Sequence, residues 1–185
     1  MKLAAIDIGS NAARLLITDV ISGPQGTVEF IKSALIRVPL RLGFDVFDKG
    51  EISAGKVEKI IKTIKSYKLL LDVYEVKHLK ACATSAMRDA ANSPEIIKKV
   101  KAETGIEIQI ISGDQEASLI YENHVAENMT SDESYLYIDV GGGSTELTFF
   151  SDGKLIFKKS SKVALCSFGF VKDLENPGAV PHSLL

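Results

Sequence analysis

The sequence predicts a mixed α/β protein built from two related lobes, and three observations favour this architecture. Short strand-like runs follow one another at the start of the chain, as in an antiparallel meander. Amphipathic helical segments and single strands then alternate through the middle of the chain, which is typical of α/β folds. Finally, the strand–loop–strand pattern of the first residues recurs 132 residues later.

The composition excludes several classes of function. The chain has 185 residues with 22 Lys and Arg against 24 Asp and Glu, so a net charge of −2 offers no field for nucleic acid or an anionic membrane. No apolar run approaches the roughly 18 residues of a membrane span. Two cysteines, Cys82 and Cys166, and three histidines make neither a disulfide framework nor a zinc cluster. We therefore expect a reduced, cytosolic protein.

The first third of the chain should form strands over residues 2–8, 13–20 and 27–36, separated by turn residues. The segment 37–52 is expected to be a loop, because it contains one Pro and two Gly. A long helix should then run from the cap residue Ser53 to about Tyr74. Its apolar residues share one face at three- to four-residue spacing: Val57, Ile60, Ile61, Ile64, Tyr67, Leu71 and Tyr74. Its lysines lie largely on the other face, which we interpret as solvated.

The remaining elements are shorter. Asn92-Ser93-Pro94-Glu95 combines a cap, a first-turn proline and an acid, and should start a helix that ends at Gly105. The other expected elements are a strand over 77–83, a helix over 85–91, a strand over 106–111, a helix over about 114–129, and strands over 135–140, 145–150 and 154–160. We assign residues 1–129 to the first lobe, 130–171 to the start of the second, and 172–185 to an irregular tail.

The internal repeat is the basis for two lobes. Residues 5–17 align with 137–149, and four pairs are identical: Ile6/Ile138, Asp7/Asp139, Gly9/Gly141 and Leu15/Leu147. Asp and Gly are common before turns, so a chance similarity of two hairpins is the alternative at this point. If the duplication is real, the second copy is shorter than the first. We then expect a truncated second lobe or a fragment, with an exposed apolar surface that favours self-association.

Two loops carry the residue types that bind phosphate. Gly9-Ser10-Asn11 and Gly141-Gly142-Gly143-Ser144-Thr145 are rich in Gly and hydroxyls, so backbone N–H groups and side chains could converge on an anion. Neither loop matches the P-loop pattern, and an ordinary hairpin turn is the alternative for either one alone. Asp7 and Asp139 end the strands before these loops, and Glu146 follows the second loop. These carboxylates are placed to hold Mg²⁺, with turn capping as the alternative.

Two further residues attract attention. Glu116 lies near the start of a predicted helix, where it either stabilises the helix dipole or serves as a general base. Arg88 begins a short helix, where it either binds phosphate through its fork of donors or forms a surface ion pair with a nearby acid. Lys80 and His78 are expected to be exposed strand residues, and Cys82 an inert buried thiol.

Five segments together resemble the exopolyphosphatase/guanosine pentaphosphate phosphohydrolase (Ppx/GppA) family. They are IDIGSNAARLLI (6–17), RLGFDV (41–46), ATSAMRDA (83–90), ISGDQEASLIY (111–121) and YIDVGGGSTEL (137–147). The resemblance covers about residues 3–160 and implies the duplicated, actin-like (ASKHA, ribonuclease H-like) phosphotransferase fold. It also implies Mg²⁺- or Mn²⁺-dependent hydrolysis of a terminal phosphoanhydride in inorganic polyphosphate or in pppGpp, the alarmone of the stringent response.

The resemblance also implies a role for each matching residue. Glu116 corresponds to the catalytic base, Arg88 to a phosphate-binding arginine, and Asp139 and Glu146 to metal ligands. Asp7 is the further candidate for the metal. The phosphate-binding positions are Gly9, Ser10, Asn11, Arg14, Gly141, Gly142, Gly143, Ser144 and Thr145.

Two other functions remain open from the sequence. An ATP-dependent kinase or ATPase of the same superfold is the nearest enzyme, although Glu116 in its segment and the GSN loop argue against it. A non-catalytic phosphate- or alarmone-binding module is the alternative from another class, because the second lobe is short. The sequence after Ser161 departs from the family pattern, and Gln115 stands where relatives often have a second Glu. A homodimer is compatible with the sequence, and no nucleic-acid or membrane partner is expected.

Overall fold

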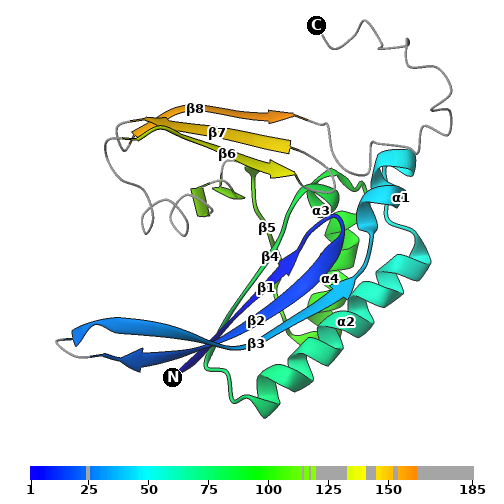
Figure 1. The fold of residues 1–185 in the computed structure, drawn as a ribbon. Helices are drawn as coiled ribbons and strands as arrows, with labels where there is room; N and C mark the ends of the chain where they lie inside the picture. Colours follow the sequence, from blue (N-terminus) through cyan, green and yellow to red (C-terminus); the bar gives the residue numbers. More distant parts are fainter. Residues whose placement is uncertain are drawn as a thin grey trace, which may run out of the picture.

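The strands of the chain form two separate sheets in the computed structural model (Figure 1). It describes residues 1–23, 26–113, 115–116, 118–119, 133–140, 145–151 and 154–161. The first sheet has the strand order β3-β2-β1-β4-β5, and the second has the order β6-β7-β8. The strands are β1 (Lys2–Ile8), β2 (Ala12–Ser22), β3 (Val28–Pro39), β4 (His78–Ala83), β5 (Gln109–Ile110), β6 (Tyr135–Val140), β7 (Thr145–Ser151) and β8 (Lys154–Ser161). The helices are α1 (Leu42–Lys49), α2 (Ala54–Val73), α3 (Ser85–Asp89) and α4 (Ser93–Thr104).

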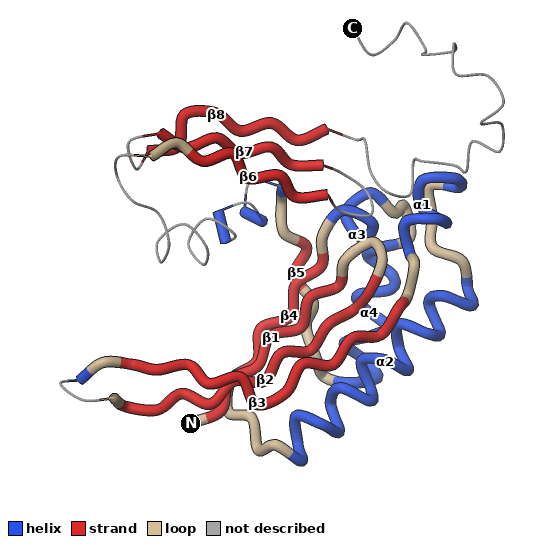
Figure 2. The backbone as a smooth tube through the Cα atoms, viewed as in Figure 1, coloured by secondary structure: helices blue, strands red, loops and turns tan. Residues whose placement is uncertain are grey.

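The first sheet begins as the predicted meander and then changes direction. β1, β2 and β3 pair antiparallel through short turns. β4 and β5 are reached through helices and lie parallel to β1 and β4, respectively (Figure 2). This arrangement brings the carboxyl ends of β1, β4 and β5 to one edge of the sheet, where ligands commonly bind in α/β folds.

Helices α2 and α4 cover one face of this sheet and form the core with it. Ile6 and Leu15 from the sheet pack in one cluster with Ile60 and Ile64 of α2 and Val100 of α4. Because these side chains recur at the strand and helix periods, the predicted apolar faces of the meander and the long helix are confirmed. None of the described helices is both long and apolar enough to cross a membrane.

Tyr67 ties the long helix to the meander. Its side chain is only 1% exposed, and its hydroxyl donates to the carbonyl oxygen of Ala13 at 3.0 Å. Burial raises the pKa of this hydroxyl. A buried tyrosine needs such a partner, and here the partner belongs to the strand that follows the first loop.

The prediction of a loop over residues 37–52 was wrong, because α1 occupies residues 42–49. Neither glycine interrupts the helix: Gly43 donates its N–H to the Ser10 carbonyl at 2.9 Å, and Gly50 ends the helix in the left-handed region with φ of 73°. Arg41 enters the helix with φ of 55°, an uncommon conformation for a residue with a Cβ. Pattern reasoning took the glycines for loop signals, whereas Gly43 is buried inside the helix and Gly50 is its cap.

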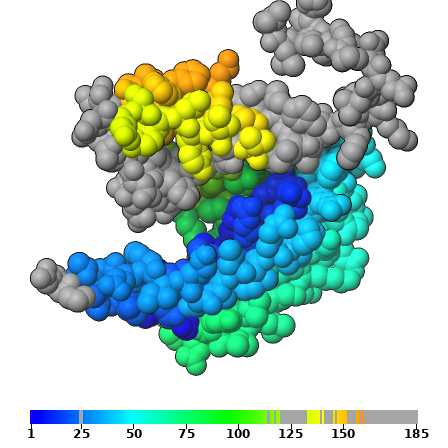
Figure 3. Space-filling model, in the orientation of Figure 1, coloured from blue at the N-terminus to red at the C-terminus, as the bar shows by residue number. Residues whose placement is uncertain are grey.

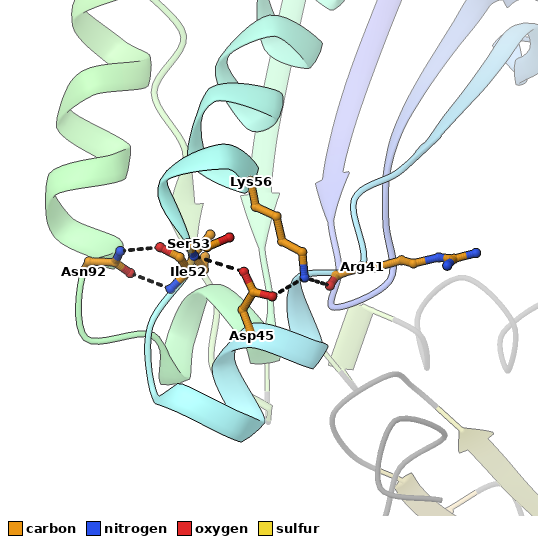
Figure 4. Close-up of polar contacts among 6 residues, drawn as sticks. All are labelled: Arg41, Asp45, Ile52, Ser53, Lys56 and Asn92. Atoms are coloured by element: carbon orange, nitrogen blue, oxygen red, sulfur yellow. Dashed lines mark hydrogen bonds and ion pairs between the residues drawn. The ribbon is translucent and has the colours of Figure 1, made fainter. Parts of the chain in front are cut away.

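A polar network holds α1 against the start of α2 (Figure 4). Lys56 donates to Asp45 at 2.5 Å and to the Arg41 carbonyl at 2.6 Å, and the Ser53 N–H donates to Asp45 at 3.0 Å. The side chain of Asn92 closes a second pair of hydrogen bonds with the backbone of Ile52. These contacts fix the turn at Arg41, which itself rests on the first loop.

The hairpins of the internal repeat are equivalent in register, so the duplication is more than a chance similarity. Asp7 is the backbone partner of Arg14 in β1–β2, and Asp139 is the partner of Glu146 in β6–β7, at the offset of 132 residues. The next strand pair of each copy, β2–β3 and β7–β8, has a register shift at the equivalent position. It lies between Ile17 and Thr18 in the first copy and between Phe149 and Phe150 in the second. β-Bulges are retained as specific features of a fold, so this second match supports a common origin of both meanders.

Most of the other expected elements that fall on described residues are confirmed. The strand 77–83, both helices up to Gly105 and the strands 135–140, 145–150 and 154–160 are confirmed within a few residues. The strand 106–111 is shorter than expected and comprises only Gln109–Ile110. Most of the helix 114–129 and the tail 172–185 lie outside the described residues, and so does the boundary at 129/130. The division into two lobes and a tail therefore stays a prediction.

The far halves of β2 and β3 project from the lobe as a two-stranded arm (Figures 1 and 3). Its apolar side chains are exposed, among them Phe30 at 66%. The arm has no helix beneath it, so it contributes little to the core.

We expect Asp45 to make the stability of the chain sensitive to acid. Partial burial alone would raise its pKa, but hydrogen bonds from Lys56 and Ser53 outweigh this effect and lower the pKa from 3.8 to about 2. A lowered pKa stabilises the folded state above the unfolded value near 4, and this contribution is lost as the pH falls through about 2. Urea unfolding of wild type and Asp45→Asn should show a gap of about 1 kcal/mol at pH 6 that closes towards pH 2. Asp48→Asn, an exposed acid of the same helix, is the control, and an equal pH dependence of all three proteins would contradict the prediction.

Candidate active site

A buried pair of hydroxyls, Ser10 and Ser85, fixes the first predicted phosphate loop to α3. Ser10 is 4% exposed and shares a hydrogen bond of 2.6 Å with Ser85, the first residue of α3. The Gly9 N–H donates to the Ala12 carbonyl at 3.0 Å and so closes the turn. Any contact of Ser10 with phosphate would therefore come from its backbone, since its hydroxyl faces α3. Asn11 is the exposed residue of the loop.

The segment after β3 supports the same loop from its other side. The N–H groups of Leu40 and Arg41 both donate to the Asn11 carbonyl, at 3.0 and 2.8 Å. Arg41 is exposed, and its side chain points away from Asp45 and Lys56 (Figure 4). The loop is thus fixed by β3, α1 and α3 together, which pre-organises it without a ligand.

A cleft of about 450 Å³ opens on the face of the sheet that the helices leave free. Its polar wall comes from β1, β2 and β4 and from the residues after β5, and Tyr137 of β6 lines it from the second sheet. Six residues carry its chemistry: Asp7, Arg14, Lys80, Cys82, Thr84 and Glu116. The cleft therefore gathers two of the predicted acids and one predicted phosphate-binding arginine at one place.

Asp7 and Arg14 form a pair across the first hairpin. Arg14 Nη1 lies 3.3 Å from Asp7 Oδ2, and both side chains remain about half exposed. Burial raises the pKa of Asp7, and the charge and hydrogen bond of Arg14 partly oppose this effect. A cation bound at this carboxylate would lower its pKa, as Arg14 does.

Arg88 and Glu116 meet at the edge where β4 and β5 end. Arg88 Nη1 donates to the Ile111 carbonyl at 3.0 Å and lies 3.9 Å from Glu116 Oε2. Their side chains are 31% and 26% exposed, respectively. The ion pair recorded for Arg88 within the described chain is therefore with Glu116, and the surface pair with a neighbouring acid is not formed there. The two residues predicted to be catalytic lie together, although they are 28 positions apart in the sequence.

The second hairpin is described only in part. Asp139 and Glu146 are direct backbone partners, but their side chains and the residues Gly141, Gly142, Gly143 and Ser144 lie outside what the structure describes. Thr145 is half-buried at the start of β7. Among the described side chains, no three of His, Cys, Asp or Glu gather in a metal-binding group. The assignments on this hairpin stay predictions.

Sequence reasoning missed four residues of the cleft, namely Lys80, Cys82, Thr84 and Tyr137. Lys80 is exposed as expected, yet it lines the cleft, and Cys82 is only partly buried beside it. Burial raises the pKa of the Cys82 thiol, which the charge of Lys80 opposes, so an unreactive thiol remains the expectation. Tyr137 also went unnoticed. The period-two alternation of Lys80 and Cys82 in β4, continued by Thr84 directly after the strand, was the available signal.

Comparison with known proteins identifies the chain. The model of the Ppx/GppA phosphatase family matches residues 18–169. The chain belongs to this family. It is 36% identical over 149 residues to the bifunctional 3-dehydroquinate synthase/phosphatase of Fusobacterium nucleatum, a match covering 78% of this chain and 22% of that protein. It is 32% identical over 148 residues to exopolyphosphatase 1 of Mycobacterium tuberculosis, which covers 80% of this chain and 42% of that protein.

Solved structures agree with this Ppx/GppA membership. The family member from Aquifex aeolicus has a TM-score of 0.72 at 32% identity, covering 90% of this chain and 53% of its own. An exopolyphosphatase from Cytophaga hutchinsonii has a TM-score of 0.78 at 28% identity, covering 89% and 51%. The predicted actin-like α/β fold class is thereby confirmed. The chain spans about half the length of these solved relatives, and less than half of the curated relatives above.

The buried hydroxyl pair allows a direct test of how the first loop is held. Ser10→Ala or Ser85→Ala should each cost about 1–3 kcal/mol of unfolding free energy, because the remaining hydroxyl is buried without its partner. The double variant should cost clearly less than the sum of the two. Urea unfolding measures all three, with the exposed Ser66→Ala as control. Strict additivity would mean that the two hydroxyls do not interact.

Proposed function

We propose that the chain carries the reaction centre of a phosphohydrolase that releases the terminal phosphate of inorganic polyphosphate or of pppGpp. The observation that carries this proposal is the contact between Arg88 and Glu116, whose carboxylate lines the cleft. In such a pair, the carboxylate can accept a proton from water while the guanidinium binds phosphate. Membership of the Ppx/GppA phosphatase family supports the same reaction class.

Arg88 would bind the phosphate that is transferred. The interactions described for its side chain both involve Nη1, whereas a guanidinium has five N–H donors in a fixed fork. The Ile111 carbonyl holds this fork in orientation, so the remaining donors can meet two phosphate oxygens. Phosphoryl transfer depends mainly on such positioning and on neutralisation of charge.

Glu116 would act as the general base. Its carboxylate lines the cleft, and its N–H donates to the Ser112 carbonyl at 2.9 Å, which fixes the backbone at this position. A carboxylate that accepts a proton from attacking water contributes typically 10²–10⁴-fold to the rate. Arg88 can then neutralise charge on the phosphate while Glu116 takes the proton.

The residues present fit a hard divalent cation. Asp139 and Glu146 are carboxylates at directly paired backbone positions, and Asp7 is a partly exposed carboxylate in the cleft. Mg²⁺ or Mn²⁺ held by them would supply neutralisation of the negative charge on the phosphates. Arg14 would share this task from the first hairpin.

Polyphosphate is the first substrate to test, since the mycobacterial relatives are named exopolyphosphatases. Turnover of ATP would instead favour a kinase or ATPase of the same fold, and binding without turnover would favour a phosphate- or alarmone-binding module. A homodimer and a cytoplasmic location remain predictions of the sequence.

Glu116→Gln should abolish Mg²⁺-dependent phosphate release from polyphosphate or pppGpp, with a loss of at least about 100-fold in kcat, because the amide cannot accept the proton of water. Phosphate release by the 185-residue chain is the measurement, with ATP as comparison substrate. Glu103→Gln is the matched control, since Glu103 pairs with Lys65 on the helical side of the sheet. Release that persists in Glu116→Gln would remove this residue from the mechanism.

Asp139→Asn should raise the Mg²⁺ concentration for half-maximal phosphate release by about tenfold, because one anionic ligand is lost. Titration with Mg²⁺ at saturating substrate measures this shift. Asp72→Asn, an exposed acid of α2, should leave the titration unchanged. An unaltered Mg²⁺ requirement in Asp139→Asn would exclude this residue as a ligand.

A further inference from the structure

One peptide group connects Arg88 to the segment that carries Glu116. It joins Ile111 to Ser112, and its carbonyl oxygen accepts a hydrogen bond from Arg88 Nη1 at 3.0 Å. Its N–H, which belongs to Ser112, donates to Gln115 Oε1, also at 3.0 Å. The C=O and the N–H of a planar trans peptide group point in opposite directions. Arg88 and Gln115 therefore bind the same peptide group from its two ends.

Gln115 also fixes the turn from which Glu116 starts. Its own N–H donates to Ser112 Oγ at 3.2 Å, so Ser112 and Gln115 bind each other reciprocally. The segment SGDQ thereby forms a capping box, with Ser at the cap and Gln three residues later. Glu116 follows directly, and its N–H donates to the Ser112 carbonyl at 2.9 Å. The backbone of the proposed base is thus set by the same capping box.

The peptide group before Ile111 is anchored separately. Ile111 is 6% exposed, and its N–H donates to the carbonyl of Ala83 at 3.0 Å, where β4 ends. This bond fixes one side of Ile111, but the next peptide group can still turn about the single bonds of the backbone. Arg88 and Gln115 are the partners recorded for that group among the described residues. Its orientation therefore depends on them.

The chemistry of the contact determines which side chains could replace Gln115. The Ser112 N–H is a donor, so it needs an acceptor oxygen, which the amide of Gln115 provides. A carboxylate could accept the same bond, whereas an apolar side chain could not. The cationic Arg88 polarises the carbonyl at the other end, and hydrogen bonds in such a row strengthen one another. Loss of the acceptor at Gln115 would therefore also weaken the contact that orients Arg88.

We propose that Gln115 is a positioning residue of the reaction centre, which holds the peptide group between Ile111 and Ser112 and through it orients both Arg88 and Glu116. This inference rests on the proposed function, because it takes Arg88 and Glu116 to be the reacting pair. Gln115 acts through these two residues and not on the substrate. Its side chain is exposed, so no contribution to the apolar core explains its place.

The test is steady-state phosphate release from polyphosphate in Mg²⁺ by the full 185-residue chain. Gln115→Ala should lower kcat about tenfold and change KM less than about threefold, because the reacting groups lose their orientation while other contacts still bind the substrate. Gln115→Glu keeps an acceptor oxygen and should restore kcat to within about twofold of wild type. Ser112→Ala is the matched control. It removes the hydroxyl of the same capping box but leaves the Ser112 N–H in place, so kcat should stay within about twofold of wild type.

Amide hydrogen exchange of Ser112, followed by NMR on the same samples, reports on the peptide group without turnover. Exchange should be about tenfold faster in Gln115→Ala than in wild type, Gln115→Glu or Ser112→Ala. Unchanged exchange or unchanged kcat in Gln115→Ala would overturn the inference. An equal loss of kcat in Gln115→Ala and Ser112→Ala would do the same, since Gln115 would then act only as part of a helix cap. A wild type that releases no phosphate refutes the proposed function, and with it any catalytic role of Gln115, whereas active variants with equal kcat refute the positioning role alone.

Discussion

The arrangement of the candidate site depends on the buried hydrogen bond between Ser10 and Ser85. It joins the loop after β1 to the helix after β4, and these two strands are parallel neighbours in the sheet. Because both hydroxyls are buried, each would be left without a partner if the loop moved. The loop in turn accepts N–H groups from Leu40, Arg41 and Gly43 through its carbonyls. The turn is thereby fixed relative to Asp7 and Thr84.

The sheet has an apolar face towards the helices and a polar face towards the cleft. The core needs the helical face to be apolar, and Ile6, Ile8 and Leu15 provide this. Since side chains alternate along a strand, the intervening positions Asp7 and Arg14 must face the cleft. The polar residues of the cleft are thus placed by the packing of the opposite face. Asp7 and Arg14 lie 3.3 Å apart, so each charge has a partner of opposite sign on this face of the sheet.

Much of this architecture could be predicted from the sequence, and the failures have physical causes. The long helix was predictable because its apolar period is regular and Ser53 precedes it. α1 was not, because Gly43 is a buried residue inside the helix and Gly50 is its cap, and both were taken for loop signals. The contact of Arg88 with Glu116 is set by the pairing of β4 with β5, which pattern reasoning cannot measure. The place of Lys80 in the wall of the cleft was not predicted, because no motif marks it.

The matched registers of the two hairpins have a consequence for the symmetry of the molecule. Position 14 of the first copy is Arg, and its counterpart in the second copy, position 146, is Glu. The backbones are related by the repeat, while the formal charge at this position is inverted. Two identical copies would carry the same charge at this position. Divergence at this single pair therefore gives the two hairpins opposite formal charges at equivalent backbone positions.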